Sequence, residues 1–385
     1  MNPFPYGHIG VICIFSVVHL GFSTIYIANC LQARIKNMGL ISKIYNLNRM
    51  TFFRRIVLPL ICKDLAVLGL IIFLSCISSL AIPLVAGAGH ATNLELYIFE
   101  KIFIEQKWNE AVILSVIQSA ILFLITWSVF KKNGFVANQK TQFFNFSLSS
   151  VFSAACLVAL ITVYICAYLY KTAIVLIAAD LNTLFDSEFA AAFLNSMITF
   201  SGLIVLFLFF LVVVIYSIYK KKHPQWINLF LSPSTILVGF GLYLLLPANQ
   251  SGTDFFKMSF GLFILFSVGL YQTYLSPQLS ELKSQLIVCR IYNLDLKIVI
   301  KNMIWPQMQK NIIFVVSLLF LLSLTEFSLL KATGSQKQTV GTLTFQYLNS
   351  YRMDQAYVIS FTCLISWLIF YALLLFLTRV KHVRD

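Results

Sequence analysis

Long stretches of apolar residues alternate with shorter polar segments along this chain. A helix needs about 20 mainly apolar residues to cross the hydrocarbon core of a bilayer, and it satisfies its backbone hydrogen bonds internally. Each long apolar stretch therefore predicts a membrane-spanning helix. Nine such stretches occur, at residues 8–31, 58–84, 111–130, 149–178, 197–219, 227–246, 256–275, 312–331 and 357–378. The predicted fold class is all-α, a polytopic helical membrane protein.

Basic residues gather in alternate connections between the predicted spans, and lysine and arginine favour the cytoplasmic side of short connections. The basic segments carry Lys131, Lys132 and Lys140, then Lys220, Lys221 and Lys222, and finally Arg379, Lys381 and Arg384. The opposite connections are acidic and include Glu95, Glu105 and Asp186. Alternation then predicts an extracytoplasmic N-terminus, a cytoplasmic C-terminus and cytoplasmic loops at about 32–57 and 276–311.

The composition supports a membrane location and argues against nucleic acid as a partner. Hydrophobic residues make up 59% of the chain and charged residues 11%, a balance that a water-soluble fold of this size does not use. The net charge of +14 comes from short basic runs between apolar stretches, without the aromatic interleaving of a nucleic-acid surface. The eight cysteines are scattered and lack metal-ligand spacing. We therefore expect contact with the lipid bilayer and no metal site.

The two predicted cytoplasmic loops contain an internal repeat. The first copy reads IYNLNRMTFFRRIVLP, from Ile44 to Pro59, and the second reads IYNLDLKIVIKNMIWP, from Ile291 to Pro306. The offset is the same at both ends, since 291 − 44 = 247 and 306 − 59 = 247. Proline suits the first turn of a helix, and asparagine tolerates the left-handed conformation of a tight turn. Each copy therefore predicts two short helices joined by a turn, with the proline separating the second helix from the following span.

Residues 40–59, LISKIYNLNRMTFFRRIVLP, resemble the EAA loop of binding-protein-dependent ATP-binding-cassette (ABC) importer permeases. That motif runs from E-A-A through a glycine to a hydrophobic-x-hydrophobic-proline ending, and Asn46 and Asn293 stand at the glycine. Leu40 and Ile287 replace its acidic residue. The resemblance implies that the loops, 32–59 and 279–306, dock on an ATPase subunit. The residues assigned to docking are Asn46, Leu47, Arg49, Phe53, Arg54 and Pro59 in the first copy, and Asn293, Leu294, Asp295, Trp305 and Pro306 in the second.

AGAGHATNLELYIFE, from Ala86 to Glu100, is similar to a segment of the thiamine importer permeases, relatives of the ferric-iron permeases. SLTEFSLL and SYRMDQAYV are similar to the end of the same permeases. The resemblance implies two pseudo-repeated permease halves. On this resemblance, residues 1–135 are expected to correspond to an incomplete first half without its first three spans, and residues 136–385 to a complete second half.

The resemblance implies a transport subunit in the inner membrane, with the C-terminus and both loops in the cytoplasm. Thiamine or its phosphates, delivered by a periplasmic binding protein, are the expected substrate, with ferric iron or another small solute as alternatives. A homodimeric ATPase subunit is expected to use the ATP. The chain has no Walker A phosphate loop and no H-E-x-x-H, G-x-S-x-G or C-x-x-C motif, so we expect no enzyme activity and no bound cofactor.

Glu326 falls within the predicted eighth span, and an ionisable group at membrane depth is costly enough to indicate a role in function. It is the candidate residue for the transport pathway. Two other classes of function stay open from the sequence. One is a secondary transporter driven by an ion gradient, which predicts charged pairs within the membrane, and the other is a non-transporting scaffold or remnant.

Overall fold

The computed structural model describes residues 7–35, 48–87, 89–132, 187–220, 234–246, 251–292, 294–335 and 337–382, together with residues 162, 166, 170, 173 and 174. These residues form helices, and no strand occurs among them, so the all-α prediction is confirmed. Five of the described helical stretches are long and apolar enough to cross a membrane: 108–125, 187–219, 252–275, 297–325 and 353–378. Shorter apolar helical stretches cover 8–21, 68–77 and 235–245. The protein is therefore embedded in a membrane.

Three predicted spans differ from the helices observed. The predicted span 58–84 is broken, because α4 (Leu58–Ile77) ends and α5 (Ala81–Ala86) follows. The predicted span 227–246 contains only α10 (Thr235–Leu245) among its described residues, and this 11-residue helix is too short to cross a bilayer. The predicted span 312–331 is also broken, since α15 (Trp305–Thr325) ends before α16 (Ser328–Ala332). Most of the predicted span 149–178 lies outside the described residues, and the count of nine stays a prediction.

The break after α4 has a local physical cause. Pro83 has no N–H to donate to Ser79, and its ring would clash with the Ser79 carbonyl in a continuous helix. The carbonyls left free at the end of α4 are partly satisfied by Asn93 Nδ2, which donates to Cys76, Ile77 and Ser79 at 3.2, 3.3 and 2.6 Å. Asn93 Oδ1 also accepts the Leu96 N–H as the N-cap of the next helix. One asparagine therefore joins two helix ends.

The repeated sequences have the same local structure. In the first copy, α3 (Arg49–Phe52) leads through a π-helical turn, η1 (Phe53–Val57), into α4. In the second copy, α14 (Leu296–Val299) leads through η6 (Ile300–Ile304) into α15. Every element begins 247 residues after its counterpart, since 296 − 49 = 247, 300 − 53 = 247 and 305 − 58 = 247. The described parts of the two copies therefore have the same sequence of short helical elements.

The similarity continues beyond the loops. Helix α5 corresponds to α16, α6 (Leu94–Phe103) to α17 (Val340–Asn349), and α7 (Trp108–Lys132) to α18 (Met353–His382). The turn between the last two helices has a non-glycine residue with positive φ in each copy, Gln106 at 55° and Tyr351 at 59°. A positive φ is uncommon outside glycine. Residues 49–132 and 296–382 thus share the order of their helices and this unusual turn, and a duplication of permease halves stays a prediction.

We call the helices α1 (His8–Ile35) to α7 the first unit and the helices α9 (Ser187–Tyr219) to α18 the second unit. The predicted boundary at residue 135 lies between them, outside the described residues. In the second unit, a long helical stretch precedes the repeat and comprises α11 (Ser251–Leu262), η4 (Phe263–Ser267), α12 (Val268–Leu270), η5 (Tyr271–Leu275) and α13 (Ser276–Ile291). Among the described residues, α9 and α10 have no counterpart in the first unit.

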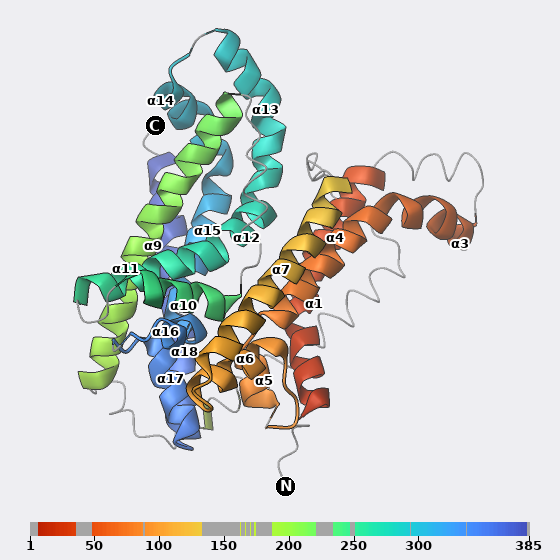
Figure 1. Ribbon diagram of the computed structural model, residues 1–385. Coiled ribbons are helices and arrows are strands. Elements are labelled where there is room, and N and C mark those ends of the chain that lie inside the picture. The colour runs from red at the N-terminus through yellow and green to blue at the C-terminus, as the bar shows by residue number, and fades with distance from the viewer. Residues whose placement is uncertain are drawn as a thin grey trace.

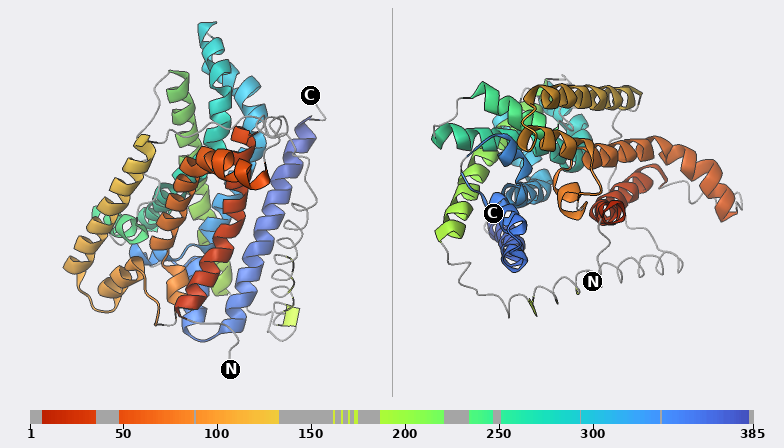
Figure 2. Two further views of the ribbon diagram at one scale, coloured as in Figure 1. Left: turned by 90° about the vertical axis from the view of Figure 1, so that its right-hand side faces the viewer. Right: turned by 60° about the horizontal axis from the view of Figure 1, so that its bottom comes forward.

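The two units lie beside each other, with α10 adjoining α6 and α7 (Figure 1). Most of the buried core belongs to the second unit, where α9 packs against α11 and α15. Phe200 of α9 lies 5.0 Å from Phe320 of α15 and 5.6 Å from Phe370 of α18 between ring centroids. Figure 2 shows α18 as one long helix that runs from the lower end of this unit to below the tip of α13. The second unit is thus the better-packed body in the part of the chain that is described.

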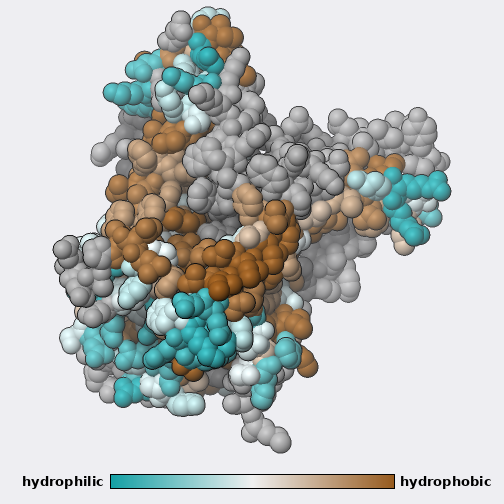
Figure 3. Space-filling model, in the orientation of Figure 1, coloured by the Kyte–Doolittle hydropathy of each residue, from teal (hydrophilic) through white to brown (hydrophobic). Residues whose placement is uncertain are grey.

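The surface has the zones expected of a membrane protein. Apolar residues cover a band across the middle of the molecule, and hydrophilic residues gather at the lower end and around the upper tips (Figure 3). Helix α14 lies near the top of the molecule, and α3 lies lower, at the outer side of the first unit (Figure 1). Both helices lie above α6 and α17 in this view.

Candidate functional site

The repeated loops end in a proline that sits inside a helix rather than between two helices. Pro59 and Pro306 are each the second residue of the α-helix that follows the π-helical turn. Proline cannot donate to the residue four positions earlier, and its ring crowds that residue's carbonyl. Those residues, Arg55 and Asn302, lie within the wider π-helical turns, which relieve the crowding. The prediction that the proline separates two helices is therefore wrong, because each loop helix runs without interruption into its span.

A consequence is that each loop is joined to its span by continuous helix. Helix α14 continues through η6 into α15, and α3 continues through η1 into α4. In the second loop, α13 ends at Ile291 and α14 begins at Leu296, so a turn between two helices occurs there as predicted. The turn of the first loop lies outside the described residues, as do Asn46, Leu47 and Asn293.

The other predicted docking residues differ in their environments. Phe53 and Arg54 are exposed on η1, and Arg49 begins α3. The carbonyl of Asp295 accepts the N–H groups of Ile298 and Val299 at 3.0 and 3.1 Å, which closes the first turn of α14. The carbonyl of Leu294 accepts the Tyr219 hydroxyl of α9 at 3.0 Å. The second loop is therefore fastened to the body of its unit.

The second loop exposes an apolar surface that the sequence analysis did not single out. We call Ile291, Tyr292, Leu294 and Ile298 the loop tip. Tyr292 is 74% exposed and Ile298 is 52% exposed, and the exposed Lys297 and Lys301 lie nearby in the sequence. The tip stands at the upper end of the molecule, beyond the apolar band (Figures 1 and 3). Exposed apolar side chains that gather in this way are typical of a surface that contacts a protein or a membrane.

Trp305 and Pro306 follow the loop tip at the start of α15. Trp305 is exposed on the surface of the first turn, where an aromatic side chain suits the interface between lipid and water. Pro306 supports the bend of the π-helical turn described above. The structure thus gives these two residues a local structural role, and any contact with a partner stays a prediction.

A second group of polar residues lies inside the molecule, where the two units meet. Glu95 was predicted in an outer connection, but its side chain is fully buried. Its Oε1 accepts the Ile236 N–H at 2.9 Å and the Ser234 hydroxyl at 3.0 Å, and it also accepts the Thr235 hydroxyl. Its Oε2 accepts Gln118 Nε2 at 2.8 Å. A buried carboxylate is tolerated when several donors surround it.

Glu326 lies just after α15 rather than within a continuous span. Its Oε1 accepts the N–H groups of Ser328 and Leu329 at 2.9 and 3.2 Å. The side chain therefore caps α16, because the first N–H groups of a helix have no partner inside it. Sequence reasoning found Glu326 by its apolar surroundings and missed Glu95, which lies in a more polar stretch.

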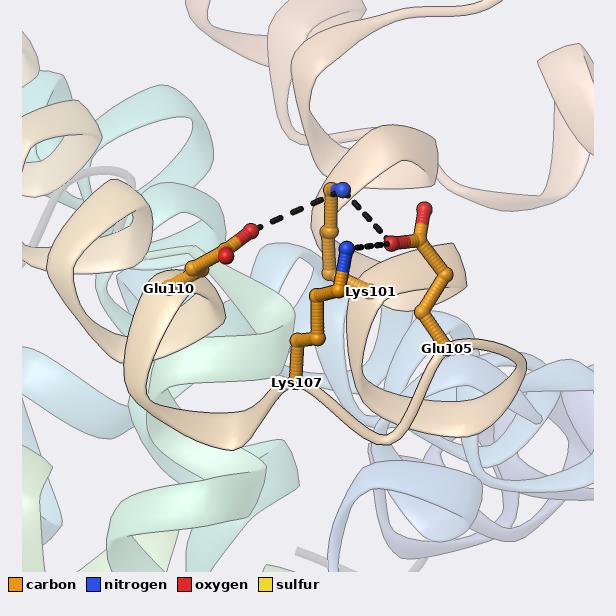
Figure 4. Close-up of polar contacts among 4 residues, drawn as sticks. All are labelled: Lys101, Glu105, Lys107 and Glu110. Carbon is orange, nitrogen blue, oxygen red and sulfur yellow. Dashed lines mark hydrogen bonds and ion pairs between the residues drawn. The ribbon is translucent and has the colours of Figure 1, made fainter.

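A third polar group occupies the turn between α6 and α7 (Figure 4). Lys101 Nζ lies 2.7 Å from Glu105 Oε2 and 3.6 Å from Glu110 Oε2, and Lys107 Nζ lies 2.9 Å from Glu105 Oε2. The hydrogen bond from Lys101, with a second from Lys107, lowers the pKa of Glu105 below its ordinary value. The hydrogen bond to Glu105 in turn raises the pKa of Lys101. These groups stabilise a turn that contains the strained Gln106 backbone.

We expect Glu105→Gln to lower the melting temperature at neutral pH and to have no effect in acid. The pKa of Glu105 is lowered by folding, so its stabilising contribution is present above the ordinary glutamate pKa and is lost as the pH falls through the folded value. Because the side chain is solvent-exposed, the effect is small. The measurement is the difference in melting temperature between wild type and variant across this pH range, and a difference that grows in acid would contradict the assignment.

The described residues include no group of three or more histidine, cysteine, aspartate or glutamate side chains arranged to hold a metal ion. The chain was also compared with protein-family models, curated proteins and solved structures, and none of them matches it.

Proposed function

We propose that this chain is the transmembrane permease subunit of an ABC importer in the inner membrane. The proposed cargo is a small solute, thiamine or its phosphates, which a periplasmic binding protein delivers. A separate ATPase subunit binds and hydrolyses ATP. The observation that supports the proposal best is the pair of similar loop sequences, whose described helical elements follow in the same order at one offset of 247 residues.

The geometry of the loops suits mechanical coupling. The short loop helices α3 and α14 continue through π-helical turns into α4 and α15. A partner that binds both loops can therefore tilt α4 and α15 together. Rocking of two repeated units against each other exposes a central path to one side of the membrane at a time. The exposed loop tip provides an apolar anchor for such a partner, and the exposed Lys297 and Lys301 add positive charge beside it.

A secondary transporter is the second candidate, and one observation favours it. The buried carboxylate of Glu95 lies at the junction of the two units, and Glu326 caps α16, which packs against α10 at the same junction. Ionisable groups at membrane depth are common in ion-coupled transport. Uptake by this class of protein stops when an ionophore collapses the ion gradient. Uptake by an ABC importer continues under the same treatment as long as ATP is supplied.

We expect Ile298→Asp to abolish copurification of the tagged chain with its co-expressed ATPase subunit. The substitution places a charge in the apolar loop tip, where docking requires desolvation.

Arg54→Glu combined with Arg55→Glu is expected to weaken capture through the first loop. Tyr351→Asp is the matched control, since Tyr351 is 88% exposed in the turn between α17 and α18. Equal capture by wild type and Ile298→Asp would rule out docking through the tip.

A further inference from the structure

Helix α10 is the element through which the two units make most of their contact in the described part of the chain. It packs against α11 and α16 of its own unit and against α6 and α7 of the first unit. Ile236 belongs to a small apolar cluster with Ile98, Ile102 and Ala111 of the first unit. Trp108 of α7 stacks on Phe240 of α10 with ring centroids 5.6 Å apart. The side chains that hold the start of α10 in place therefore also hold the two units together.

The start of α10 is completed by a residue of the first unit. Ser234 is the N-cap and accepts the Leu237 N–H, while the Glu95 carboxylate accepts the Ile236 N–H and the hydroxyls of Ser234 and Thr235. Negative charge is favoured at the N-terminus of a helix, where the first N–H groups lack intrahelical partners. One side chain thus receives three donors from consecutive residues of the opposite unit.

The other face of α10 is held tightly by the second unit. A Cβ atom built on Gly239 would lie 2.4 Å from Ala332 Cβ and 3.2 Å from the Leu329 carbonyl oxygen. Helices come this close only where a small residue permits it. Helix α16, the partner in this contact, is in turn capped by Glu326 at the end of α15. A continuous chain of contacts therefore leads from the second loop through α15, α16 and α10 to Glu95.

Helix α17, which corresponds to α6, has no carboxylate at the position of Glu95. Glu95 is the second residue of α6, and the second residue of α17 is Gly341, at the same offset as the two N-caps, since 341 − 95 = 246 and 339 − 93 = 246. Gly341 packs directly against the backbone carbonyl oxygens of Thr325 and Glu326. The fold of these helices therefore does not require an acidic side chain at this position. The contacts of Glu95 with α10 of the other unit explain the carboxylate instead.

We propose that Glu95 is a positioning residue that fastens the first unit to the first turn of α10, so that a displacement of either unit is transmitted to the other. The contacts that carry this proposal are those of the folded chain, and it does not depend on the proposed transport function. Gln118 supports the arrangement from α7 by donating to Oε2. Removal of the carboxylate leaves the donors of Ile236, Ser234, Thr235 and Gln118 without their acceptor.

The test uses two pairs of engineered cysteines in the full-length chain, after replacement of the native cysteines. Trp108→Cys with Phe240→Cys reports the contact between units, and Phe200→Cys with Phe320→Cys reports a contact inside the second unit. The yield of the disulfide or short cross-link is measured in membranes by mass spectrometry. With Glu95→Ala, we expect the yield of the first pair to fall at least fivefold, whereas that of the second pair stays unchanged.

Glu95→Gln retains one acceptor oxygen and is expected to give an intermediate yield for the first pair. Glu105→Ala, a change of an exposed acid in the next turn, is expected to leave both yields unaltered. Unchanged yield of the first pair in Glu95→Ala would overturn the proposal. An equal loss in both pairs, in Glu95→Gln as well as Glu95→Ala, would assign Glu95 to general folding and would also overturn it. These outcomes hold whether or not the chain transports a solute.

Discussion

Replacing Gly239 by alanine is expected to destabilise the protein by about 1–3 kcal/mol, the usual cost of forcing an extra group into a packed core. The new Cβ would lie 2.4 Å from Ala332 Cβ and 3.1 Å from the Ala332 carbonyl carbon, so α10 and α16 have to separate. Neither neighbour is the end of a flexible side chain, and the strain is therefore not relieved by a rotamer change. The free energy of unfolding in mixed detergent micelles measures this cost.

Gly241 provides a matched control two residues further along the same helix. A Cβ atom there has no neighbour within 4 Å, and alanine favours a helix over glycine by roughly 0.5–1 kcal/mol. Gly241→Ala is therefore expected to be neutral or stabilising. Equal effects of the two substitutions would show that the close packing of α10 on α16 does not contribute to stability.

Phe207→Ala is expected to be the second strongly destabilising substitution. Phe207 is fully buried in the core formed by α9 and its neighbours. Phenylalanine to alanine costs about 3–5 kcal/mol in water-soluble cores. We expect a loss of about 2–4 kcal/mol here. The lost packing contacts and the cavity cost as much as in a water-soluble core, but the hydrophobic contribution is smaller because lipid is as apolar as the protein interior. The measurement is again unfolding in mixed micelles.

Phe209→Ala serves as the control on the opposite face of the same helix. Phe209 is 69% exposed, so its removal opens no cavity and the expected change is small. A loss of stability as large as that of Phe207→Ala would indicate that this face of α9 is covered in the folded protein, contrary to the packing described above.

Several features of the fold were predictable from the sequence because they depend on local patterns. Long apolar stretches predicted most of the helices, and the repeated sequences after the IYNL segments correspond to the same short helical elements, α3 with η1 and α14 with η6. The effect of the prolines was not predictable from position alone. A proline near a helix start usually marks a boundary, whereas a π-helical turn keeps the helix continuous around Pro59 and Pro306.

Features that depend on contacts between distant residues were not predictable in the same way. Hydropathy averages over a window, so the end of α4 near Pro83 and the end of α15 before Glu326 did not interrupt the predicted spans. Glu95 followed the charge pattern of an outer connection, but its donors lie about 140 residues away in sequence, at Ser234 to Ile236. Only the packing of α6 against α10 brings these groups together.

Docking of the repeated loops on an ATPase subunit can be tested by a photo-cross-link from the loop tip. A photoreactive phenylalanine analogue at Tyr292 is compared with the same analogue at Tyr351, since both tyrosines are highly exposed and lie toward opposite ends of the molecule. In membranes that contain the co-expressed ATPase subunit, we expect a cross-linked product with that subunit from position 292 and none from position 351. Absence of the product from position 292, or its formation from position 351 instead, would rule out docking through the loop tip.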